Sequence, residues 1–191
     1  MSISKSKIDK AGLALARNRY RSDDEYFKLE EVFDEYRKSH LQPLTETTLT
    51  LQSWLSGYPN SYYIAQRLKR KPQIIRKLLR FNTRLTQLQD IGGARIIVET
   101  NSEADRLYGF LLEQIRNNYQ INLLKETDYR EKGRDDSGYR ALHLILDVGG
   151  RKVELQIRGL PLIEWVDYRM SDERQRAIYT DSGYPFSLAS V

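Results

Sequence analysis

Polar and apolar side chains alternate in the run VELQIR, residues 153–158. Alternate residues of an extended strand point to the same face, so Glu154, Gln156 and Arg158 would lie side by side. Such a face is either an ordinary solvated strand surface or a site that binds a charged ligand. The gathering of a carboxylate, an amide and a guanidinium favours the floor of an active site.

A second strand precedes this one, and the two are joined by Gly149-Gly150. A two-residue glycine turn predicts a β-hairpin with a fixed register. In that register Leu142, Leu144 and Leu146 oppose Ile157, Leu155 and Val153 on the core face. On the other face His143 opposes Gln156, Ile145 opposes Glu154 and Ala141 opposes Arg158.

One segment carries the excess positive charge of the chain. Residues 61–89 contain eight Lys/Arg and no acid, while the rest holds 23 basic and 26 acidic residues. Pro72 suits the first turn of a helix, whose free N–H groups favour phosphates. Asp90 follows, just before a buried strand expected at 94–99, which could bring it close to Glu154. Two carboxylates beside many cations indicate a Mg²⁺–nucleotide site, although a solvated basic helix face is the competing interpretation.

Composition excludes several other kinds of site. The chain has 191 residues and no cysteine, so disulfides, thiolate metal sites and a cysteine nucleophile are excluded. Two histidines, His40 and His143, are too few for a histidine-rich metal centre. No apolar run approaches the roughly 18 residues that span a bilayer, so we expect no membrane association and a cytoplasmic location.

Periodicity predicts the remaining elements. Ser22 and Glu25 form a capping-box pattern before a helix that ends near His40. Further helices are expected at 45–56, from Pro72 onward, after a cap at Ser102, and from 161 to 179. A strand is expected at 121–127.

Four blocks in order resemble the synthetase domain of the RelA/SpoT family. They are RLKRKPQIIRKL, DIGGARIIV, SGYRALH and VELQIR, and the resemblance covers about residues 60–165. It implies an α/β fold with a nucleotidyltransferase-like mixed β-sheet flanked by helices. It also implies an ATP pyrophosphokinase that moves the β,γ-pyrophosphate of ATP to a ribose 3′-hydroxyl. The expected layout is a helical region at 1–60, a synthetase core at 61–180 and a tail at 181–191, within one compact domain.

The resemblance also implies residue roles. Arg67 and Arg95 match arginines that enclose the adenine of ATP, and Lys69 and Lys77 match the block that grips its phosphates. Four further residues match groups on the acceptor side of the site: Tyr139, His143, Gln156 and Arg158. Asp90 and Glu154 match the catalytic carboxylates that hold Mg²⁺, and Glu154 can also take the proton of the attacking hydroxyl.

Within the family, the chain is most similar to the small stand-alone members, especially the toxic small alarmone synthetases. That similarity implies a toxin of a toxin–antitoxin pair, with an antitoxin protein as partner and the 3′-CCA end of tRNA as acceptor. The alternative is a synthetase that makes (p)ppGpp or ppApp from free purine nucleotides. Departures such as Gly159, which stands where threonine usually follows the Gln-Ile-Arg motif, leave the acceptor open.

Overall fold

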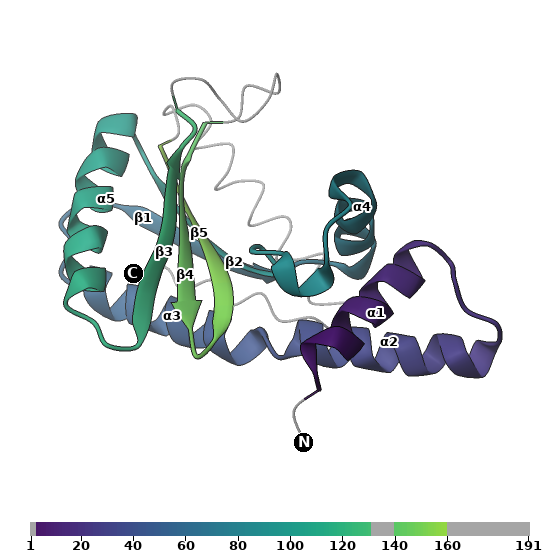
Figure 1. Cartoon of the computed structure of the whole chain (residues 1–191). Coiled ribbons are helices and arrows are strands. Elements are labelled where there is room, and N and C mark those ends of the chain that lie inside the picture. Colours follow the sequence, from purple (N-terminus) through teal and green to yellow (C-terminus); the bar gives the residue numbers. More distant parts are fainter. Residues whose placement is uncertain (1–2, 131–139, 160–191) are drawn as a thin grey trace, which may run out of the picture.

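The computed structural model describes residues 3–130 and 140–159. Figure 1 shows its elements along the chain: α1 (Lys5–Ala16), α2 (Asp23–Lys38), α3 (Leu41–Leu55), β1 (Tyr62–Leu68), α4 (Lys71–Phe81), the short 3₁₀ helix η1 (Leu85–Gln87), β2 (Gly92–Val98), α5 (Asn101–Arg116), β3 (Ile121–Asp128), β4 (Leu142–Val148) and β5 (Arg151–Gly159). The helix expected at 161–179 and the tail at 181–191 lie outside the described residues. None of the helices in the described part has the length and apolarity needed to cross a membrane.

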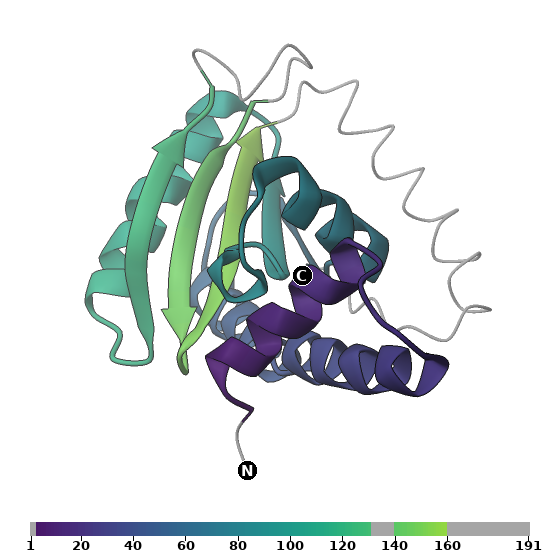
Figure 2. The ribbon, with the colours of Figure 1, turned by 45° about the vertical axis from the view of Figure 1, so that its right-hand side comes forward.

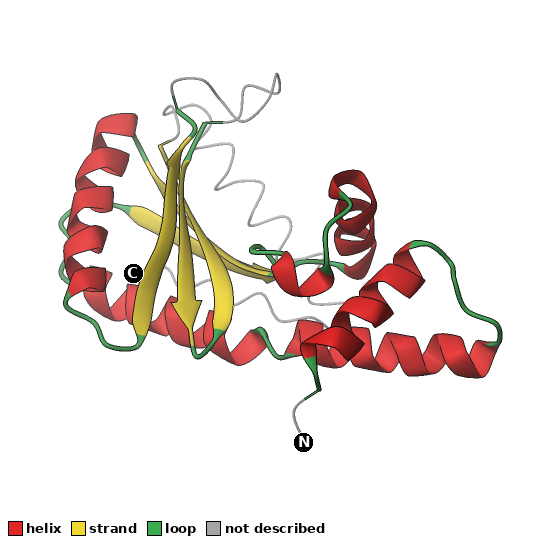
Figure 3. Ribbon diagram, viewed as in Figure 1, coloured by secondary structure: helices red, strands yellow, loops and turns green. Residues whose placement is uncertain are grey.

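A single mixed sheet organises these elements. Its strand order is β1-β2-β5-β4-β3, with β2 and β5 parallel and every other neighbouring pair antiparallel. Helices flank the sheet, as Figure 3 shows. The expected fold class, an α/β protein with a mixed sheet flanked by helices, is therefore confirmed.

The β4–β5 hairpin has the register expected from its turn. Leu142, Leu144 and Leu146 face Ile157, Leu155 and Val153, and His143 faces Gln156. Gly149 and Gly150 have φ values of 57° and 77°, the left-handed conformation that a two-residue turn of this kind requires. The turn thus fixes which side chains reach the polar face.

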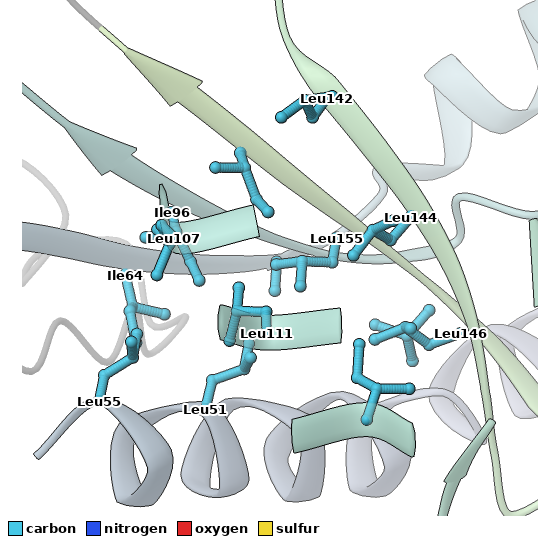
Figure 4. Packing of buried hydrophobic residues seen from close by; sticks show 14 of the residues in the cluster. Leu51, Leu55, Ile64, Ile96, Leu107, Leu111, Leu142, Leu144, Leu146 and Leu155 are labelled. Carbon is cyan, nitrogen blue, oxygen red and sulfur yellow. The ribbon is translucent and has the colours of Figure 1, made fainter. Parts of the chain in front are cut away.

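The main core lies between one face of the sheet and helices α3 and α5. Figure 4 shows leucines of both helices packed against leucines and isoleucines of the strands. Leu51 of α3, Leu111 of α5 and Leu155 of β5 are fully buried there. Because this face is filled with apolar side chains, the opposite face is left to carry the polar residues.

A second apolar cluster joins α1 and α2 to α4 and η1. It includes Phe33 of α2, Ile74 of α4 and Leu85 of η1, all fully buried. Figure 2 shows α1 and α4 side by side in front of the sheet, with α5 behind it. This cluster holds α4, the basic helix, in place, and it extends to the start of β2 because Ile91 belongs to it.

The expected layout, with a helical region at 1–60, a synthetase core at 61–180 and a tail at 181–191, stays a prediction.

Helix boundaries follow their caps, with two corrections. Ser22 caps α2 by accepting a hydrogen bond from the Glu25 N–H at 3.2 Å, as expected. The next helix begins at Leu41 rather than 45, because Pro43 is tolerated in a first turn, where the N–H has no intrahelical partner. The cap of α5 is Thr100, not Ser102: its hydroxyl accepts from the Glu103 N–H at 3.0 Å.

Two elements were not expected from the sequence. Helix α1 is capped by Ser4, whose hydroxyl accepts from the Lys7 N–H at 3.3 Å, but its small residues give only a weak apolar stripe. Strand β1 lies within the basic segment, where its polar residues hide the alternation of a strand. Its pairing with β2 brings Arg67 opposite Gly93.

The end of β5 explains one departure from the family pattern. A Cβ atom on Gly159 would lie 2.4 Å from the carbonyl carbon of Thr100, far inside van der Waals contact. Threonine therefore does not fit at this position with the observed backbone.

Candidate active site

The polar face of the sheet places the expected site residues in adjacent rows. Across β1, β2 and β5, Arg67 faces Gly93, and Gly93 faces Glu154. In the next row Arg95 faces Gln156, and Gln156 faces His143 of β4. Residues two apart on a strand share a face, so the two rows form one continuous polar patch.

Glu154 is held from two sides. Its Oε1 atom lies 3.0 Å from Nδ1 of His143, and its Oε2 atom accepts a hydrogen bond of 2.7 Å from the Gln156 amide. Burial acts to raise the pKa of Glu154, but the hydrogen bonds with His143 and Gln156 outweigh it, so the pKa lies below its usual value. Glu154 is therefore an ionised carboxylate at neutral pH.

The other end of Gln156 contacts Arg95. The amide oxygen accepts from Nε of Arg95 at 3.0 Å and from Nη2 at 2.9 Å. Arg95, Gln156, Glu154 and His143 thus form one hydrogen-bonded chain across three strands. Sequence reasoning expected these residues in one site but not this order of contacts.

Asp90 lies just before β2, between two lysines. Its Oδ2 atom accepts from Nζ of Lys77 at 2.6 Å and from Nζ of Lys69 as well. Burial acts to raise the pKa of Asp90, but the hydrogen bonds and charges of both lysines outweigh it and hold the pKa below its usual value. Lys69 is positioned by the sheet, since its N–H extends the β1–β2 pairing to the Ile91 carbonyl at 2.8 Å.

The residues at Asp90 and Glu154 fit a magnesium ion. The two carboxylates are near enough that the charge of Asp90 acts to raise the pKa of Glu154. Oδ1 of Asp90 is buried and has no hydrogen-bond partner within the described part of the chain, so it remains available to a cation. No cluster of three or more His, Asp or Glu suited to a metal occurs among the described residues. Mg²⁺ is commonly held by one or two carboxylates plus substrate phosphates.

The basic segment divides into paired lysines and exposed arginines. Lys69 and Lys77 pair with Asp90, and Lys71 pairs with Glu30 of α2. By contrast, five arginines of the segment are exposed to solvent: Arg67, Arg70, Arg76, Arg80 and Arg84. Arg67 reaches the polar sheet face from β1, whereas Arg76 and Arg80 lie on α4.

The remaining expected residues lie at or beyond the edge of the described part. Arg158 is half-buried on β5 and faces Ile97 of β2. Tyr139 lies outside the described residues. Sequence reasoning missed Tyr129, whose ring meets that of His143 edge-on at 4.9 Å between centroids. Its position directly after strand β3 was the available signal.

A hollow with a volume of about 720 Å³ lies between α1 and the segment after α4. We call it the α1 groove. Four cations line it, together with polar residues and Leu13: Lys5, Lys10, Arg17 and Arg84. Asp9 also borders it, but its carboxylate accepts from the N–H of Thr86 at 2.9 Å and from its hydroxyl at 2.8 Å.

Comparison with known proteins identifies the family. The family model described as "Region found in RelA / SpoT proteins" matches residues 66–173. No curated protein matches the chain. Among solved structures, small alarmone synthetase 2 from Bacillus subtilis is 25% identical, with a TM-score of 0.51, covering 78% of this chain and 80% of that one.

Two further structures share the fold. A GTP pyrophosphokinase family protein from Streptococcus pneumoniae is 22% identical, with a TM-score of 0.57 and coverage of 80% of each chain. Small alarmone synthetase 1 from Bacillus subtilis is 21% identical, with a TM-score of 0.52, covering 75% of this chain and 81% of that one. The family match spans more than half of the chain and includes both carboxylates and the paired lysine Lys69. The chain therefore belongs to the RelA/SpoT family and is an enzyme of the ATP pyrophosphokinase type.

Proposed function

We propose that the chain transfers the β,γ-pyrophosphate of ATP to the ribose 3′-hydroxyl at the CCA end of tRNA, as the toxin of a toxin–antitoxin pair. On the donor side, Arg67 and Arg95 are diagonal neighbours on adjacent strands. Planar guanidinium groups stack on aromatic rings, so this pair is suited to adenine. Lys69 and Lys77 lie at the same end of the sheet and can neutralise phosphates.

The reaction needs positioning and charge neutralisation rather than a covalent intermediate. The 3′-oxygen of the acceptor attacks the β-phosphorus of ATP, the bond from that phosphorus to the α-phosphate oxygen breaks, and AMP leaves. The hydroxyl proton passes to the ionised carboxylate of Glu154. Mg²⁺, held by Asp90 and Glu154, would supply neutralisation of the phosphate charge.

The proposal that tRNA is the acceptor rests on one observation: the surface carries more basic residues than the binding of ATP needs. The exposed Arg76 and Arg80 of α4 and the four cations of the α1 groove lie outside the polar sheet face. A positively charged surface of this extent is typical of proteins that bind a nucleic-acid backbone. His143, Gln156, Arg158 and Tyr139 remain proposed as groups on the acceptor side of the site.

The alternative acceptor is a free purine nucleotide, giving (p)ppGpp or ppApp. It is favoured by the 25% identity to a protein named small alarmone synthetase 2. In that case the basic residues of the polar sheet face would bind ATP and the acceptor nucleotide, and the α1 groove would not bind the acceptor. Both alternatives place the enzyme in the cytoplasm with ATP, and the toxin alternative adds an antitoxin protein as partner.

One experiment separates the acceptors. The purified chain is incubated with Mg²⁺ and ATP labelled in its γ-phosphate, together with GDP, GTP, AMP, unlabelled ATP or bulk tRNA in separate reactions. Label on the 3′-terminal nucleotide of tRNA supports the proposal. Label on a free nucleotide with unlabelled tRNA contradicts it and supports the alarmone alternative.

A further inference from the structure

Among the described residues, Gln156 is the one whose side-chain amide contacts both a proposed ATP-binding group and a proposed catalytic carboxylate. Its oxygen accepts two hydrogen bonds from Arg95, at 3.0 and 2.9 Å. Its nitrogen donates to Oε2 of Glu154 at 2.7 Å. The side chain is half-buried on β5.

The strands fix this arrangement. Gln156 faces Arg95 of β2 directly in the parallel register, and it follows Glu154 by two residues on the same face. An amide has an acceptor at one end and donors at the other. It can therefore face a guanidinium and a carboxylate at once, which neither an acidic nor an apolar side chain of similar length can do.

The far side of Glu154 is held by His143. Nδ1 of His143 lies 3.0 Å from Oε1 of Glu154, and the His143 ring is buried. Each oxygen of Glu154 therefore has its own partner, and Gln156 is the partner that leads back to Arg95. A change in the position of Arg95 is transmitted to Glu154 through one neutral side chain.

We infer that Gln156 is a positioning residue that couples ATP binding at Arg95 to the orientation of Glu154. This inference rests on the roles proposed for Arg95 and Glu154. When adenine lies against Arg95, the guanidinium is held in one place, and the amide then holds Oε2 of Glu154 in the orientation that receives the proton. ATP occupancy and the readiness of the carboxylate are thereby linked.

Two substitutions of Gln156 separate coupling from a merely structural role. Gln156→Leu removes both contacts, so we expect ATP affinity to fall and kcat to fall, each by about tenfold, within the range found for coupled neighbours. Gln156→Glu keeps an acceptor for Arg95 but places a second carboxylate against Glu154. ATP affinity is then retained while kcat falls, a split that loss of structure does not produce.

The matched control is Gln66→Leu. Gln66 is also a half-buried glutamine of this sheet, but it faces Ala94 on the core side and accepts from the Thr48 hydroxyl at 2.6 Å. We expect its substitution to change the melting temperature without separating ATP affinity from kcat.

The experiment uses four proteins besides the wild type: Gln156→Leu, Gln156→Glu, Arg95→Ala and the double variant Arg95→Ala/Gln156→Leu. For each protein, calorimetry gives the affinity for an ATP analogue. The kcat is measured with the acceptor that the wild-type enzyme uses. The expected result is the split between the two Gln156 variants, together with a double variant that binds ATP no more weakly than Arg95→Ala alone. Multiplicative effects on ATP affinity, or equal losses in Gln156→Glu and Gln156→Leu, would overturn the inference. Affinity is measured without turnover, so a wrong acceptor leaves this test intact.

Discussion

Nζ of Lys77 lies 2.6 Å from Oδ2 of Asp90, and Lys69 contacts the same oxygen from the end of β1. A carboxylate proposed to hold Mg²⁺ thus binds the two ammonium groups proposed to hold the ATP phosphates. The carboxylate of Asp90 offsets part of the positive charge of the two lysines. ATP must draw the lysines from Asp90, and a cation at Asp90 would release them.

The first prediction concerns Asp90→Asn. It should lower transfer by about 10²–10³-fold, as expected for an electrostatic group of this kind. It should also tighten ATP binding in the absence of Mg²⁺. Lys69 and Lys77 would then bind the ATP phosphates without first breaking their ion pairs with Asp90. A gain of about tenfold is reasonable, since charge-assisted hydrogen bonds contribute about 1.5–3 kcal/mol and tenfold is about 1.4 kcal/mol.

Calorimetry with a non-hydrolysable ATP analogue and a chelator checks this. Asp147→Asn is the matched control, because Asp147 is a half-buried carboxylate on β4 that faces Lys152. If Asp90→Asn binds the analogue equally or more weakly without metal, the lysines are not restrained by Asp90.

The second prediction concerns the adenine contact. Arg67→Ala and Arg95→Ala should each weaken ATP binding while the melting temperature stays close to wild type, since cation–π stacking contributes about 0.5–2 kcal/mol. Arg95→Ala should have the larger effect on kcat, because only Arg95 is bonded to Gln156. Unchanged ATP affinity in both variants would place the adenine elsewhere.

The third prediction concerns tRNA. Lys10→Glu and Arg84→Glu should weaken tRNA binding most strongly at low salt and leave transfer to free nucleotides unchanged. Each lost phosphate contact should reduce the slope of log affinity against log salt by about one. Filter binding across salt concentrations checks this, with Lys125→Glu on the exposed face of β3 as the control. An equal loss in the Lys125 variant would mean that net charge, not the α1 groove, binds tRNA.

The fourth prediction concerns His40, which is buried between α2 and α3. Burial lowers the pKa of His40 to about 4, and the charge of Arg151 acts in the same direction. His40 is therefore neutral in the folded chain at a pH where the unfolded chain, with a pKa near 6.5, has bound a proton. Stability from this residue is complete above about pH 6.5 and declines as the pH falls toward 4.

The expected loss between pH 7 and pH 5 is about 2 kcal/mol of unfolding free energy. His40→Gln keeps a donor for the Tyr36 carbonyl, which lies 3.0 Å from Nδ1 of His40, but does not titrate. Urea unfolding of both proteins at the two pH values gives the difference. An identical pH dependence in wild type and variant would show that His40 is protonated to the same extent in both states.

The sequence predicts the register of the β4–β5 hairpin, but it does not predict the contacts among the charged side chains of the site. The hairpin register followed from Gly149-Gly150, because a two-residue turn leaves one pairing that buries the leucines. The placement of Glu154, Gln156 and His143 on one face followed from it. Helix α1 and strand β1 could not be recognised, since small residues in one and polar residues in the other obscure the period.

The pairing of Asp90 with Lys69 and Lys77 could not be predicted from the sequence either. It depends on the end of β1, the middle of α4 and the start of β2 meeting in space, and α4 is held there by the apolar cluster with α1 and α2. The contact between Gln156 and Arg95 required the parallel pairing of β2 with β5. Spacing along the chain does not specify that neighbour.

The most direct test of the central claim is the identity of the group that leaves ATP. Wild-type enzyme and Glu154→Gln are incubated with ATP and the acceptor that becomes labelled, and AMP and ADP are quantified by chromatography. Transfer of pyrophosphate predicts one AMP released for each acceptor modified, no ADP, and loss of AMP release in Glu154→Gln. Release of ADP with transfer of a single phosphate, or unchanged AMP release in the Glu154 variant, would contradict a pyrophosphokinase site built around Glu154.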